Sequence, residues 1–189
     1  FDGCEPIQFA DPAITQYVLS ELGPRCQQLS ILLPTLLIYA LLLLLGVVGN
    51  ACTCVVIVAD RCMHNPTNFY LFSLAVSDII ILILGLPMEL HGVLGHSYPY
   101  SFSPAICKLR AFLIEFTSYA SVTVICAFSV ERYFAICFPL RAKLFSTLRR
   151  AMTVTFVAWF ISFFAALPMA LIVEVNRLPL PPGIDNATM

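Results

Sequence analysis

The chain has 189 residues, of which 60% are hydrophobic and 11% are charged, and its formal net charge is -1. A soluble domain is about half apolar and about a quarter charged, so this composition excludes a soluble domain and indicates a membrane protein. The near-neutral charge also argues against a nucleic-acid partner.

The first 30 residues form an acidic region that precedes the apolar part of the chain. This region lacks the basic start and the continuous apolar core of a signal peptide. We therefore expect residues 1–30 to form a loose extracellular N-terminal tail.

Four apolar segments are long enough to cross a hydrocarbon core of about 30 Å as helices. They cover residues 32–59, 67–94, 104–138 and 151–173. Backbone groups in lipid must be satisfied within their own segment, so each segment is predicted to be helical. The fold class is therefore all-α, a polytopic membrane helix bundle. Residues 31–175 form its transmembrane part, and residues 176–189 begin a further extracellular loop.

The loops between these spans differ in charge. Basic residues follow the first and third spans: Arg61, Arg141, Lys143, Arg149 and Arg150. The positive-inside rule places these loops in the cytoplasm and the N-terminus outside the cell, as in a multi-pass plasma-membrane protein. Asn186, in an Asn-Ala-Thr triplet, then lies on the outer side as a candidate glycosylation acceptor.

Three carboxylates lie within the predicted spans, where ionisable groups usually face a bundle interior or a wet cavity. Glu89 follows Asp78 by 11 residues, about three helical turns, which places both on one stripe of the second span. Glu89 and Glu115 are expected at similar depths, where their charges would repel each other. A cationic ligand, best an arginine, would relieve this repulsion. Alternatively, each acid hydrogen bonds to a neighbouring helix.

Asp78 lies at the depth of two hydroxyl groups on the third span, those of Thr117 and Ser121, with Asn50 nearby on the first span. A carboxylate and hydroxyls in a small wet pocket suit Na⁺, which prefers oxygen ligands. The alternative is a polar clamp between helices that holds no ion.

The third span carries a cysteine at one end and an acid–arginine pair at the other. Cys107 and Arg132 are 25 residues apart, which corresponds to about 37 Å of helix. Cys107 is expected outside the cell, where it could form a disulfide. Arg132 follows Glu131 at the cytoplasmic edge, either as a snorkelling side chain or as a switch that Glu131 holds in one state. The sequence shows no catalytic constellation, so we do not expect an enzyme.

Several short motifs, taken in order, resemble the rhodopsin-like class of G-protein-coupled receptors. They are Gly49-Asn50, Leu74-Ala75-Val76-Ser77-Asp78, Cys107, Glu131-Arg132-Tyr133, Pro139-Leu140, Trp159 and Pro168. Residues 65–78 and 85–90 are further similar to the neuromedin U and pyrokinin receptor group, which is related to the ghrelin, motilin and neurotensin receptors. That class has seven spans, so the chain is expected to be a fragment with four of them.

The resemblance implies a receptor for an amidated neuropeptide, whose arginine would bind between Glu89 and Glu115. It implies that Glu131, Arg132, Tyr133 and Leu140 serve coupling to a G protein, of Gq type by analogy, and that Asp78 with Ser121 holds Na⁺. Cys107 would pair with a cysteine in the loop after the fourth span.

Three alternatives remain open from the sequence. One is another peptide receptor of the ghrelin, motilin and neurotensin group. A second is an element of a transporter or channel, with the three buried acids lining a cation path. A third is a naturally truncated receptor that associates with full-length copies.

Overall fold

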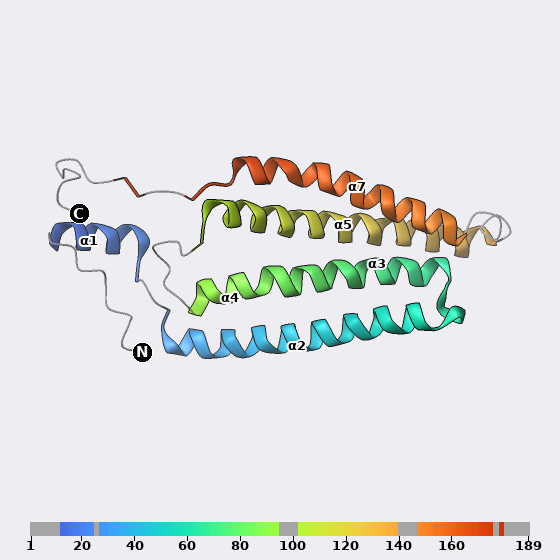
Figure 1. The fold of residues 1–189 in the computed structure, drawn as a ribbon, viewed down its shortest axis with the longest axis horizontal. Coiled ribbons are helices and arrows are strands. Elements are labelled where there is room, and N and C mark those ends of the chain that lie inside the picture. Colours follow the sequence, from blue (N-terminus) through green and yellow to red (C-terminus); the bar gives the residue numbers. More distant parts are fainter. Residues whose placement is uncertain (1–11, 25–26, 95–101, 140–146, 176–177, 180–189) are drawn as a thin grey trace.

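In the computed structural model, residues 12–24, 27–94, 102–139, 147–175 and 178–179 are described. All regular elements in these ranges are helical, which confirms the predicted fold class. Four long helical segments, seen as parallel rods in Figure 1, dominate the arrangement.

The four predicted spans are confirmed, with small shifts at their ends. The first is α2 (Leu29–Ala59), the third is α5 (Pro104–Cys137) and the fourth is α7 (Leu148–Ile172). The second span covers Pro66–Leu94 and has an interruption within it. Each of the four is long and apolar enough to cross a membrane.

The second span consists of three consecutive pieces. These are α3 (Pro66–Ile80), the π-helix η2 (Ile81–Gly85) and α4 (Leu86–Leu94). A short 3₁₀ helix, η1 (Arg61–Met63), leads into it from α2. The π-helical turn makes this span irregular.

Part of the acidic N-terminal region is helical, so the expectation of a loose tail over residues 1–30 is wrong for this part. Helix α1 covers Pro12–Leu22, and its Ile14 is only 2% exposed. Gly23 follows at φ +73°, and its N–H donates to the Leu19 carbonyl at 3.0 Å. A glycine in the left-handed region is a common end of a helix, because it satisfies a carbonyl of the last turn without a Cβ clash.

Polar residues at three loop–helix junctions explain where the spans begin. The side chains of Asn65, Ser103 and Thr147 accept hydrogen bonds from the backbone N–H groups of Asn68, Ile106 and Arg150. These N-caps satisfy donors that have no partner within the helix. Prolines at the first helical position of α3 and α5 fit there because that N–H would be unpaired in any case.

The second span is the central element of the bundle. Its α3 part packs against α2 on one side and against α5 and α7 on the other, and α5 packs along α7 (Figure 1). The core between them contains Tyr70, Val124, Ala151 and Ala158. Small residues at helix interfaces let membrane helices approach closely.

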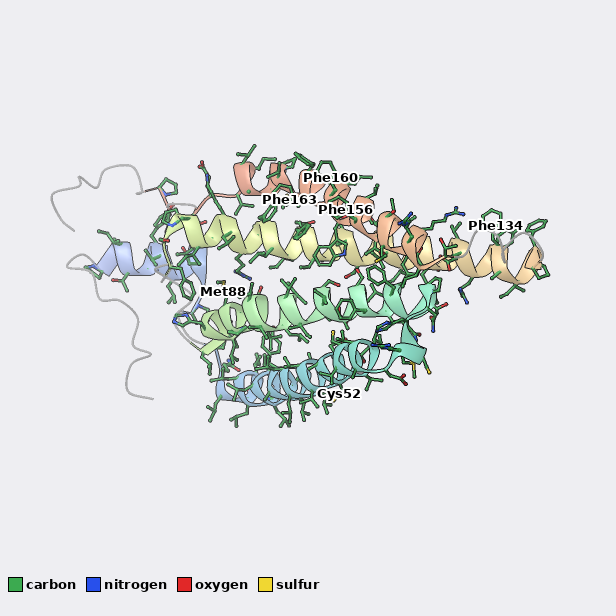
Figure 2. All side chains as sticks on the ribbon, turned by 45° about the vertical axis from the view of Figure 1, so that its right-hand side comes forward. Cys52, Met88, Phe134, Phe156, Phe160 and Phe163 are labelled. Atoms are coloured by element: carbon green, nitrogen blue, oxygen red, sulfur yellow. The ribbon has the colours of Figure 1, made fainter. Side chains whose placement is uncertain are left out.

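The outward faces of the bundle are strongly apolar. On α7, Phe156 and Phe160 are exposed, and on α5 Phe134 is exposed (Figure 2). Cys52 lies on an exposed face of α2. Such faces suit contact with lipid or with further helices.

Candidate functional site

Polar residues lie at three levels along the bundle. We call the end that contains α4 and the start of α5 the outer end, and the end that contains η1 and the start of α7 the inner end, following the charge pattern. In Figure 1 the outer end is on the left.

At the outer end, α4 and α5 are joined by an ion pair. Arg110 Nη2, in the second turn of α5, donates to Glu89 Oε1, in the first turn of α4. The Arg110 and Glu89 side chains are 28% and 43% exposed, so water reaches both in part. The positive charge of Arg110 therefore compensates the negative charge of Glu89.

The π-helix η2 explains why Glu89 faces α5. The stripe predicted to hold both Asp78 and Glu89 requires regular α-helix between them, but η2 covers Ile81–Gly85. A π-turn closes i→i+5 hydrogen bonds and so contains one more residue than an α-turn. One extra residue changes the helical phase by about 100° at 3.6 residues per turn. The prediction of a common stripe is therefore wrong.

Glu115 lies deeper on α5 and on a different face from Arg110. The two are five residues apart, which corresponds to a rotation of about 140° and a rise of about 7.5 Å. The Tyr119 side chain, one turn further along, interacts electrostatically with Glu115. Within the described residues the salt bridges are those of Arg110 and Arg132 with glutamates, so Glu115 has no basic partner there.

Two alternatives were open for Glu89 and Glu115, namely repulsion at a shared cavity or a bond from each acid to a neighbouring helix, and the second holds for Glu89. Arg110 lies within the predicted third span, near its outer end. In the structure it lies inside α5 and neutralises one of the two acids. Only Glu115 keeps an uncompensated charge among the acids in the outer half of the described spans.

Asp78, in the middle of the second span, borders a cavity of about 340 Å³ between α2 and the second span. Asn50 and Gly46 of α2 also line this cavity. The Asn50 side-chain amide donates to the Gly46 carbonyl at 2.9 Å. A carboxylate and a side-chain amide therefore border one mid-membrane space.

The hydroxyl groups expected beside Asp78 have other hydrogen-bond partners. Ser121 Oγ lies 2.8 Å from Ser77 Oγ, the hydroxyl next to Asp78 in sequence. Thr117 Oγ1 donates to the Leu113 carbonyl at 2.7 Å within α5. Ser121 thus lies against α3 as predicted, but its direct contact there is with Ser77. Each hydroxyl oxygen can still accept a bond or hold a cation.

At the inner end, Arg132 lies between an acid and an aromatic ring. Its Nη2 donates to Glu131 Oε1 at 3.2 Å, and its guanidinium carbon lies 5.7 Å from the centre of the Phe128 ring. The local ion pair of these neighbouring residues is therefore present. Arg132 Nε is buried and has no hydrogen-bond partner within the described part of the chain.

Tyr70 connects this arrangement to the second span. Its ring packs edge-on against Phe128 with centroids 6.1 Å apart, and its side chain interacts electrostatically with Glu131. Tyr70 is 2% exposed. Glu131 therefore has a partner on α3 as well as Arg132 on α5.

Four predicted site residues remain, namely Tyr133, Cys107, Leu140 and Asn186. Tyr133 is exposed at the inner end of α5 and packs edge-on against Phe134. Cys107 is half-buried at the start of α5 and has a free thiol. Leu140 and Asn186 lie outside the described residues.

Sequence reasoning missed three contributors to these sites, namely Arg110, Tyr70 and Phe128. The signal for Arg110 was its position as the seventh residue of an apolar span that begins at Pro104. Tyr70 and Phe128 carried no signal beyond an aromatic residue in an apolar helix, because their partners come from another helix or from the next turn.

Residues 49–182 match the sequence profile of the family described as 7 transmembrane receptor (rhodopsin family). This match covers more than half of the chain. The chain belongs to the rhodopsin family of seven-transmembrane receptors. This family contains receptors and not enzymes, in agreement with the expectation from the sequence.

Relatives with similar sequences are named as receptors of the predicted neuromedin U and pyrokinin group. The chain is 62% identical over 175 residues to the neuromedin U receptor homolog nmur-2 of Caenorhabditis elegans, covering 93% of the chain and 43% of that protein. It is 42% identical to neuromedin-U receptor 2 of Rattus norvegicus over 168 residues, covering 89% and 42%. It is 43% identical to the pyrokinin-1 receptor of Drosophila melanogaster over 150 residues, covering 79% and 35%. The chain spans less than half the length of these rhodopsin-family relatives.

Proposed function

We propose that the full-length protein is a plasma-membrane receptor for an amidated neuropeptide of the neuromedin U or pyrokinin type. An arginine of the peptide binds the Glu115 carboxylate at the outer end. Binding alters the inner end, where Arg132 is released toward a heterotrimeric G protein of Gq type. The names of the relatives support the ligand class.

The observation that carries this proposal is the separation of two charged centres on one helix. Glu115 and Arg132 both lie on α5, 17 residues apart, which corresponds to about 25 Å along the axis. Glu115, an acid without a basic partner among the described residues, lies toward the outer end, and Arg132, paired with Glu131, lies at the inner end. This arrangement suits a protein that binds a cation outside the cell and signals inside it. The agonist must bind the signalling state more tightly, since only differential affinity shifts the equilibrium.

We propose the membrane orientation on the same basis. Basic residues at the inner end, such as Arg61 and Arg149, favour the cytoplasm, so the N-terminus lies outside. In this orientation Cys107 is available for a disulfide with an extracellular-loop cysteine, and Asn186 for a glycan.

We further propose that Asp78 holds Na⁺ in the resting receptor. The residues fit such an ion. Asp78 and Asn50 line the same cavity. The hydroxyl of Ser77, the residue before Asp78, is hydrogen bonded to that of Ser121. A bound cation would compensate the Asp78 charge at mid-membrane depth, where an unpaired carboxylate is costly. Sodium and agonist would then oppose each other reciprocally.

The proposed function is tested in the full-length receptor expressed in cells. The probes are a synthetic amidated peptide with one arginine near its C-terminus and an analogue with neutral citrulline at that position. We expect the citrulline peptide to bind at least about tenfold more weakly, because it loses a charge-assisted contact. In the Glu115→Gln receptor the two peptides should bind alike. Equal binding of both peptides to the unmodified receptor would refute the cation site.

Coupling is tested separately. Nucleotide exchange on a purified Gq-type protein should rise with the arginine peptide and should be lost in Arg132→Ala. Peptide-stimulated exchange that persists in Arg132→Ala would contradict the proposed role of this residue.

A further inference from the structure

We propose that a groove between α2, α3 and α7 at the inner end binds an anionic phospholipid, with an acyl chain among apolar side chains and the headgroup beside Arg61 and Arg149. The groove is a cavity of about 300 Å³. Helix α5, which carries Glu115 and Arg132, contributes no residue to its described lining. The inference is therefore independent of the peptide and of the G protein, and it uses only the proposed orientation, in which the inner end is cytoplasmic.

The walls of the groove are apolar and come from three helices. Ile57 belongs to α2, Phe72 to α3 and Met152 to α7. Val58 and Met152, at its edges on α2 and α7, are exposed. Because lipid tails are as apolar as these side chains, an acyl chain that enters the groove gains packing but no hydrophobic free energy. The headgroup must therefore decide which lipid is bound.

The polarity of the lining changes along the groove in the order that a phospholipid requires. His64 and Asn65, between η1 and α3, line its inner rim. Phe72 lies seven residues beyond Asn65, which caps α3, and is therefore about 10 Å deeper. A molecule with a polar head at the membrane surface and an apolar chain below it matches this arrangement.

The inner rim is positively charged. Arg61 in η1 and Arg149 in the first turn of α7 are exposed, and neither forms a salt bridge within the described residues. The acid of this rim is Asp60, whose carboxylate accepts the Cys62 N–H at 2.8 Å and so caps η1. Anionic lipids are enriched in the cytoplasmic leaflet, and basic pockets between transmembrane helices on that side bind their headgroups. The charge of the rim therefore favours an anionic headgroup over a neutral one.

Hydrogen bonds hold the rim in position. The His64 N–H donates to the Arg61 carbonyl at 3.2 Å, which closes the turn of η1. The side-chain amide of Asn68, on α3, donates to the Met63 carbonyl at 3.0 Å and so ties η1 to the second span. A site that is already formed requires little ordering when its ligand binds.

Helical phase separates Arg149 from its neighbour Arg150. Leu148 and Met152 are one turn apart on α7, and both line the groove. At about 100° per residue, Arg149 lies about 60° from Met152 around the helix, whereas Arg150 lies about 160° from both lining residues. Arg150 instead interacts electrostatically with Tyr70. Arg149 therefore borders the groove, and Arg150 provides a charge on the opposite side of the same turn.

The experiment uses the purified full-length receptor in nanodiscs of phosphatidylcholine with a minor share of phosphatidylserine. The measured quantity is the ratio of the two lipids that stay bound in native mass spectrometry, relative to their ratio in the nanodisc. We expect enrichment of phosphatidylserine and an about fivefold loss of this enrichment in Arg149→Gln, the scale of one basic residue near an anionic surface. Arg150→Gln removes the same charge on the opposite side of α7 and should leave the ratio nearly unchanged.

Met152→Trp tests whether the chain enters the groove, because the larger side chain fills it. This variant should retain less of both lipids, whereas Phe156→Trp, one turn deeper on an exposed face of α7, should retain as much as the unmodified receptor. Equal losses in Arg149→Gln and Arg150→Gln would show only a diffuse surface charge, and full retention in Met152→Trp would show that the groove is not used. Either result would overturn the inference. An unmodified receptor without enrichment would show that a sterol or a further receptor helix occupies the groove, which would also overturn it.

Discussion

The indole nitrogen of Trp159 donates a 2.8 Å hydrogen bond to the hydroxyl of Ser73, and this bond joins α7 to α3 across 86 residues of sequence. Ser73 is 5% exposed. The Trp159 ring also packs edge-on against Phe116 of α5, with centroids 5.4 Å apart. One side chain thus connects three of the four spans.

Trp159→Phe should destabilise the receptor by about 1 kcal/mol, the usual size of a hydrogen bond between membrane helices. The phenyl ring keeps most of the packing but cannot donate to Ser73. The measurement is thermal unfolding of the purified full-length receptor in lipid nanodiscs. In a double-mutant cycle with Ser73→Ala, the two losses should not add. Additive losses would show that the bond contributes nothing.

Gly46→Val should destabilise the contact between α2 and the second span by about 1 kcal/mol, the low end of the range for overpacking, because the atom it meets is the end of a flexible leucine side chain. A Cβ added at Gly46 would lie 2.5 Å from Leu82 Cδ1. A Cβ added at Gly49, on the same helix, would meet no atom within 4 Å, so Gly49→Val is the matched control. Thermal unfolding should show a loss for the first variant and little for the second. Leu82→Ala should restore part of the loss, and a failure to do so would contradict this contact.

Phe128→Leu should raise basal nucleotide exchange on the G protein. The ring of Phe128 lies beneath the Arg132 guanidinium, and such cation–π contacts contribute about 0.5–2 kcal/mol. Its loss should increase the released population of Arg132 by about two- to thirtyfold. Phe160→Leu, on the exposed face of α7, is the control and should leave basal exchange unchanged. An unchanged basal rate in Phe128→Leu would remove Phe128 from the switch.

Asp78→Asn should abolish the effect of sodium on agonist affinity, because the neutral amide cannot compensate a cation. Ser121→Ala should retain part of the effect, since Ser121 Oγ bonds to Ser77 Oγ. Agonist competition binding in sodium and in N-methylglucamine buffers measures both. Sodium sensitivity that persists in Asp78→Asn would rule out this site.

Sequence alone was sufficient for the four spans and for the receptor family. Long apolar segments satisfy their own backbone groups as helices, so their number and approximate ends follow from composition and local caps such as Asn65 and Ser103. The acid–arginine pair of Glu131 and Arg132 was also predictable, because its members are adjacent in the chain.

The direction in which side chains point was decided by the tertiary structure. The π-helix at Ile81–Gly85 has no clear sequence signal, yet it turns Glu89 toward Arg110 and away from the stripe of Asp78. Ser121 likewise bonds to Ser77, because the packing of α5 against α3 determines which hydroxyl it meets. Hydrophobicity along the chain sets where helices run, whereas pairing between charged and polar groups depends on helical phase and packing, which involve residues far apart in sequence.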